Sequence, residues 1–117
     1  MTHKKMNPEA KAKWLAALCS GKYIQDKGML ERREGGKAVG NCCLGVLLRS
    51  QGVKPQIKKD DVAFGHDRNG NPEYSVLTPH YLEKFGIDVD SMNHLWHMND
   101  RVGNSFKQIA AWIERNL

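Results

Sequence analysis

Two long segments carry apolar residues at the spacing of an α-helix that packs on a core. One begins at the capping sequence Asn7-Pro8-Glu9 and ends near Gly21. The other follows Ser105, which together with Gln108 forms a capping box. We expect both apolar faces to be buried. These faces consist of Ala10, Trp14, Leu15, Leu18 and Cys19 in the first helix, and of Phe106, Ile109, Ala110, Ile113 and Leu117 in the last.

Shorter apolar runs with start and stop residues predict three more helices. Asn41 is expected to cap the most apolar of them, which runs from Cys42 to Gln51 and stops at Gly52. A second starts at Thr78-Pro79 and stops at Gly86, and a third covers residues 91–99.

Asn69-Gly70 lies between apolar runs and predicts a β-hairpin near residues 62–77. The segment 23–30 is expected to be a strand or an extended loop, and a turn at Gly35-Gly36 follows it. The pattern therefore predicts an α+β fold in which four or five short helices surround one core. At this length we expect a single domain over residues 1–117.

Composition limits the setting in which this domain works. No apolar run approaches the roughly 20 residues that a membrane-spanning helix needs, and the N-terminus is charged where an export signal would be apolar. Three cysteines, two of them adjacent, form no plausible disulfide framework. We therefore expect a cytoplasmic protein without a membrane partner.

Charge is distributed unevenly along the chain. Residues 1–59 contain 13 Lys and Arg against 4 Asp and Glu, whereas residues 60–117 contain 5 against 9. A basic half permits a nucleic-acid partner, but opposite charges also permit attraction between the two halves or head-to-tail contact between copies. The basic residues considered for such a surface are Lys11, Lys13, Lys22, Lys27, Arg32, Arg33 and Lys37.

Four segments, spread over nearly the whole chain, resemble a family of small, mostly uncharacterised proteins of bacteriophages and prophages. They are Trp14–Gln25, Cys42-Cys43-Leu44-Gly45-Val46-Leu47, Met98-Asn99-Asp100 and Ser105-Phe106-Lys107-Gln108-Ile109-Ala110. The resemblance implies an accessory role directed at host machinery or host defences. It names no target and carries over no activity.

Cys42 is the candidate nucleophile. At the first position of a helix, free N–H groups and the helix dipole favour a thiolate, and Gly45 would leave room for a substrate. His97 is a candidate base and Asn99 a candidate orienting group. The order Gln, Cys, His, Asn is distantly similar to that of papain-like hydrolases, although the residues around Cys42 match none of their local motifs. The alternative is that both cysteines are small buried hydrophobic residues of the core, which is the more common role of a free cysteine.

Gln25, Cys43, Asn99 and Asp100 are the candidate ligand-binding residues. The loop 99–104 joins two helices, and loops on rigid scaffolds often carry sites, but turn formation alone also explains its composition. His94 and His97 lack the third ligand that zinc requires, so no metal and no cofactor is expected.

These features rank three functions and leave open whether any reaction is catalysed. The first is binding of a host protein or other host macromolecule. The second is a hydrolase or transferase that uses Cys42, and the third is nucleic-acid binding through the basic half. The oligomeric state is not indicated.

Overall fold

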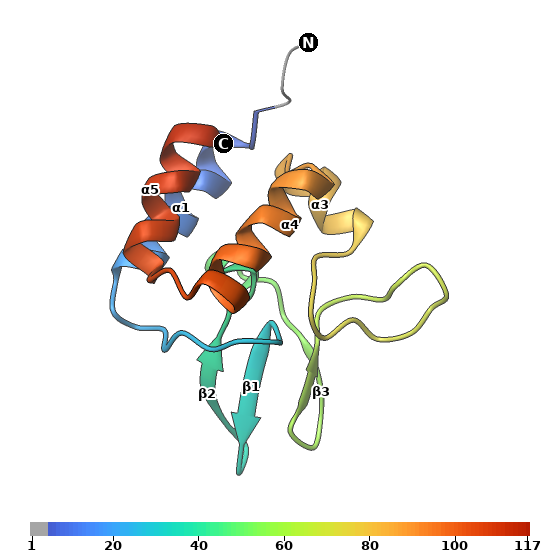
Figure 1. The fold of residues 1–117 in the computed structure, drawn as a ribbon. Coiled ribbons are helices and arrows are strands. Elements are labelled where there is room, and N and C mark those ends of the chain that lie inside the picture. Colours follow the sequence, from blue (N-terminus) through green and yellow to red (C-terminus); the bar gives the residue numbers. More distant parts are fainter. Residues whose placement is uncertain (1–4) are drawn as a thin grey trace.

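The computed structural model describes residues 5–117. The first four residues of the predicted domain, which are also part of the charged N-terminus, lie outside the described residues. Helices gather at one end of the molecule and the strands project from the other (Figure 1), so the predicted α+β class is confirmed. In chain order the elements are α1 (Pro8–Cys19), β1 (Glu31–Glu34), β2 (Lys37–Asn41), α2 (Cys43–Ser50), β3 (Gln56–Lys58), β4 (Asp61–Ala63), α3 (Pro79–Phe85), α4 (Val89–His97), the π-helical turn η1 (Met98–Val102) and α5 (Phe106–Asn116).

The core lies between α2 and the helices that pack around it. Every residue of α2 from Cys43 to Leu48 is buried, and the predicted stripe of α5 is buried as well. On α1, Trp14 is fully buried and its Nε1 donates a 2.9 Å hydrogen bond to the carbonyl oxygen of Cys43. Cys19 was predicted to be on the buried face, but it is exposed at the last residue of α1, directly after the buried Leu18.

Local capping follows the sequence at most helix ends. Asn7 Oδ1 accepts hydrogen bonds from the amides of Glu9 and Ala10, and the capping box of Ser105 and Gln108 is complete. None of the helices in the described residues is long and apolar enough to cross a membrane. The predicted cap at Asn41 is wrong, because Asn41 is the last residue of β2 and the N-cap of α2 is Cys42.

Two antiparallel hairpins, β1–β2 and β3–β4, form separate two-stranded sheets. Gly35 and Gly36 make the turn between β1 and β2 with φ of 58° and 80°, a conformation that two-residue hairpin turns require and glycine adopts readily. A register shift between Arg32 and Arg33 marks a bulge in this hairpin.

The predicted 62–77 hairpin is only partly built. The chain turns back around Gly70, and the Phe64 amide donates to the Glu73 carbonyl at 2.9 Å. Strand structure is limited to residues 61–63, which pair with β3 instead. Pro72 has no N–H to donate, and the Glu73 carboxylate accepts from the amides of Tyr74 and Ser75, so the returning arm lacks donors for a longer ladder.

Substitution of Ile109 tests whether the apolar face of α5 is packed in the core. Its side chain is fully buried on α5, so Ile109→Ala is expected to lower the free energy of unfolding by roughly 2–5 kcal/mol. Lys107→Ala, at an exposed position of the same helix, is the control and should change stability little. Urea unfolding followed by circular dichroism measures both, and an Ile109→Ala curve that overlaps that of the control would contradict the packing.

Candidate functional site

The structure brings the four predicted ligand-binding residues together around one buried amide. Asn99, which is 1 % exposed, accepts hydrogen bonds at Oδ1 from Gln25 Nε2 at 3.0 Å and from the Cys43 amide at 3.2 Å. Its Nδ2 donates to the Asp26 carbonyl at 2.7 Å and to Asp100 Oδ1 at 2.8 Å. All four hydrogen-bonding positions of the amide are therefore occupied by the protein itself.

Asn99 also caps α2 from a distance. The N-cap residue Cys42 makes no side-chain capping bond, and Asn99 Oδ1 accepts from the first amide of the helix, that of Cys43. Asn99 reaches this position from η1, where the α-helical pattern of α4 gives way to a π-helical turn. Such turns are rare and frequently occur at functional sites.

The same network holds the segment between α1 and β1. The Gly28 amide donates to Asp100 Oδ2 at 2.9 Å, and Gln25 Nε2 also donates to the Asn104 carbonyl at 2.7 Å. On the other side of this segment, the Asn41 amide donates to the Ile24 carbonyl, and the Asp26 amide donates to the Asn41 carbonyl. The predicted site residues thus fix a loop in place.

Cys42 does not have the environment that a nucleophile needs. Its side chain is 3 % exposed, and burial raises the pKa of its thiol to about 11, with the charge of Asp100 acting in the same direction against weaker backbone hydrogen bonds. The predicted approach past Gly45 is closed, since a Cβ there would lie 1.7 Å from the Leu30 carbonyl oxygen. The expectation of a lowered pKa is wrong, because desolvation outweighs the helix N-terminus.

The other members of the proposed catalytic set are arranged no better. Burial raises the pKa of Cys43, whose Sγ donates to the Leu95 carbonyl at 3.7 Å. His97 is exposed at the end of α4, and within the described residues no hydrogen bond joins it to Cys42 or to Asn99. His94, its neighbour on the helix, packs against the Trp112 ring with 4.6 Å between centroids. No group of three or more metal-ligating side chains occurs in residues 5–117.

A second buried polar group, which the sequence did not reveal, is Glu31 on β1. Arg49 Nε and Nη2 donate to its two oxygens at 2.7 and 2.8 Å, and Asn41 Nδ2 donates to Oε1 at 3.3 Å. Burial alone would raise the pKa of Glu31, but these hydrogen bonds and the charges of Arg49 and Arg33 outweigh it and lower the pKa. Glu31 is therefore a buried, ion-paired carboxylate.

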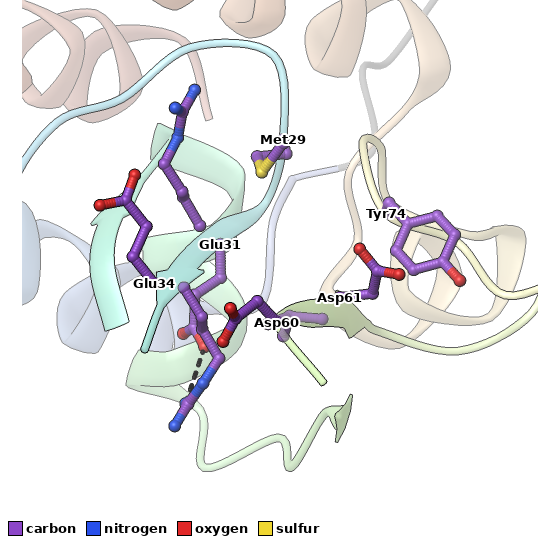
Figure 2. Close-up of a pocket in the computed structure, with 9 residues that line it drawn as sticks. Met29, Glu31, Glu34, Asp60, Asp61 and Tyr74 are labelled. Carbon is purple, nitrogen blue, oxygen red and sulfur yellow. Dashed lines mark ion pairs between the residues drawn. The ribbon is translucent and has the colours of Figure 1, made fainter. Parts of the chain in front are cut away.

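Glu31 lines two open grooves on the surface of the protein. The basic groove, of about 250 Å³, is lined by Lys22, Tyr23, Ile24, Val39 and Arg49. The acidic groove, of about 320 Å³, lies between β1 and the β3–β4 hairpin and includes Met29, Glu34, Asp60, Asp61 and Tyr74 (Figure 2).

The arginines that line the acidic groove are ion-paired, although Nε of each is buried without a hydrogen bond in the described residues. Arg33 pairs with Glu31 at 3.6 Å, the ion pair that is dashed in Figure 2, and Arg32 Nε lies 2.7 Å from Asp26 Oδ2. The side chains that remain to a ligand there are mostly carboxylates. The two grooves therefore differ in the sign of the charge that they offer to a ligand.

The fold and the grooves describe a small α+β protein with a closed polar network and open, charged surfaces. A family model matches residues 6–71, more than half of the chain, and the protein belongs to this family, which is described as a domain of unknown function, DUF8296. The match includes all the residues that line the basic groove, and also Cys42 and Cys43, but it does not include Asn99. No curated protein and no solved structure matches the chain.

Asn99→Ala is expected to destabilise the protein by roughly 2–4 kcal/mol. The substitution leaves the buried Cys43 amide and the Asp26 carbonyl without their partner, and each such loss costs about 1–3 kcal/mol. Asn93→Ala, at an exposed position of α4, is the matched control. Equal urea midpoints for the two variants would show that the network contributes nothing to stability.

Thiol labelling separates the three cysteines. In the folded protein, exposed Cys19 should react first with a maleimide or an aromatic disulfide, whereas Cys42 and Cys43 should react only after unfolding. With a pKa of about 11, roughly one Cys42 thiol in a thousand is ionised at pH 8. Mass spectrometry of timed samples, with Cys19→Ser as the control, measures the order. Labelling of Cys42 ahead of Cys19 would restore the nucleophile hypothesis.

Proposed function

We propose that the protein is a small accessory protein of a bacteriophage or prophage that acts in the host cytoplasm by binding a host protein. The sequence resemblance supports the phage origin. The observation that carries the binding role is Ile24, a large apolar side chain that is 70 % exposed at the border of the basic groove. A partner that covers it would gain apolar contact with little rearrangement of this protein.

The backbone around Ile24 is held before any partner arrives. Its own carbonyl accepts from Asn41, and the next residue, Gln25, is fixed by two side-chain hydrogen bonds. Ordering a loop on binding costs free energy, and a loop that is already ordered avoids that cost. The buried network around Asn99 therefore supports binding more directly than it supports catalysis.

Charge around Ile24 favours an acidic partner. Lys22 is its near neighbour, and a further hollow of about 320 Å³ that shares Lys22 and Tyr23 with the basic groove adds Lys13. Glu31 is the carboxylate that lines the basic groove, and it is buried and ion-paired with Arg49. Opposite charges across an interface mainly increase specificity and the association rate.

Nucleic-acid binding is the second candidate, and fewer cations support it than the sequence suggested. Arg32 and Arg33 are ion-paired, and Lys11 Nζ donates to the Glu114 carbonyl at 3.0 Å. Lys13, Lys22, Lys27 and Lys37 remain of the seven residues considered. With so few phosphate contacts, affinity for duplex DNA is expected to be weak.

Ile24→Asp tests the binding role. The tagged wild-type protein, incubated with a lysate of the bacterium that carries the gene, should capture a host protein in near-equal amount. Ile24→Asp should lose at least about 90 % of that capture, since a substitution at an interface centre costs about 2 kcal/mol or more, and about 1.4 kcal/mol already weakens binding tenfold. Quantitative mass spectrometry measures both.

The control is Ile57→Asp on β3, where the side chain is 47 % exposed and lies outside the basic groove. It should retain the captured protein, and both variants should unfold at the wild-type temperature. Capture that is insensitive to Ile24 would remove the proposed role of this surface. A DNA mobility shift whose salt slope approaches −0.9 for each of several phosphates would favour the nucleic-acid alternative instead.

A further inference from the structure

We infer that the basic groove recognises a carboxylate side chain in a short, extended acidic segment of the partner protein, with Arg49 and Lys22 as the groups that bind it. This inference rests on the proposed function and specifies the chemistry of the partner. It is carried by the geometry of Arg49, by the open edge of β2 and by the apolar side chains beside them.

The Arg49 guanidinium is fixed in position by Glu31 and still has donors that can bind a second anion. Nε and Nη2 are bound to the two oxygens of Glu31, and the guanidinium carbon lies 5.7 Å from the centre of the Phe64 ring. Within the described residues Nη1 has no hydrogen-bond partner, and the side chain is 28 % exposed where it lines the groove. The side chain is therefore fixed and partly open, and it retains donors for a carboxylate.

Lys22 and Tyr23 line the same groove as Arg49. The charged residues that line this groove are two cations, Lys22 and Arg49, and one anion, Glu31, so the lining carries a net positive charge. This excess makes the groove attractive to a carboxylate. The groove does not offer the row of cations that a nucleic-acid backbone requires.

The edge of β2 determines the shape of the ligand. β2 pairs with β1 on one side, and on the other side Asn41 alone pairs with residues 24–26 in the described part of the chain. Ala38, Val39 and Gly40 line the groove along the rest of this edge. An extended segment can add to such an edge, and the bulge in the hairpin limits the pairing to a short stretch. Ile24 and Val39 form an apolar surface that apolar side chains of the extended segment can contact.

Two octapeptide libraries provide the probe, one with Glu fixed at a central position and one with Gln there, both randomised elsewhere. Peptides retained by the immobilised protein are identified by mass spectrometry, and the best Glu peptide is resynthesised with Gln in its place. We expect the Gln peptide to bind about tenfold more weakly, because it loses a charge-assisted hydrogen bond. Fluorescence anisotropy measures the dissociation constants.

Lys22→Gln completes a double-mutant cycle. It should weaken the Glu peptide about tenfold and leave the Gln peptide unchanged, whereas Lys54→Gln, an exposed control outside the groove, should alter neither. Lys22 is exposed on the surface, so the variant should keep the wild-type fold. Amide NMR shifts on titration with the Glu peptide should concentrate at residues 22–24 and 38–40.

Several results would overturn the inference: no peptide retained, equal affinity for the Glu and Gln peptides, shifts centred on Asp60 and Asp61, or preference for a phosphoserine library. If capture from lysate still depends on Ile24 in any of these cases, carboxylate recognition alone has failed. If capture does not depend on Ile24, the proposed function has failed with it.

Discussion

The arrangement of this protein depends on the side-chain amide of Asn99, which joins three segments that are distant in sequence. Its oxygen holds the start of α2 and the side chain of Gln25, and its nitrogen holds the backbone of Asp26 and the carboxylate of Asp100. An amide that is fully bonded in a buried position both stabilises and selects one arrangement, because any shift leaves several polar groups unpaired. The loop that exposes Ile24 is a consequence of this constraint.

Asn41 connects this network to the Glu31–Arg49 ion pair. Its backbone pairs with residues 24–26, and its side chain donates to Glu31 Oε1 and to the Leu30 carbonyl at 3.1 Å. Asn41 thus contacts both segments that line the basic groove: it binds Ile24 directly and Arg49 through Glu31. The distance between these segments is therefore set by the fold rather than by flexible loops.

The sequence predicted what depends on neighbours along the chain and missed what depends on distant partners. The caps at Asn7 and Ser105 and the stop at Gly86 require residues within one turn, and all three are present. Asn41 is also a residue type that commonly caps helices, but it ends β2. Asn99, which is 56 residues beyond Cys43, takes the capping role instead. The Glu31–Arg49 pair and the β3–β4 hairpin involve no periodic pattern, so nothing local indicated them. The four predicted ligand-binding residues do meet, and their mutual hydrogen bonds hold a loop in place, while their binding of a ligand stays a prediction.

Burial explains why Cys42 is better understood as part of the core than as a nucleophile. A helix N-terminus favours a thiolate by a limited amount, whereas removing a charge from water costs more, and here the first effect is weakened because Asn99 already occupies the first free amide of α2. The Leu30 carbonyl fills the space beside Gly45 that a substrate would need. The same close approach places Leu30, the residue before β1, against α2, and the next residue, Glu31, pairs with Arg49 of α2 at the basic groove. The sealed interior and the open charged surface therefore both depend on how the start of β1 packs against α2.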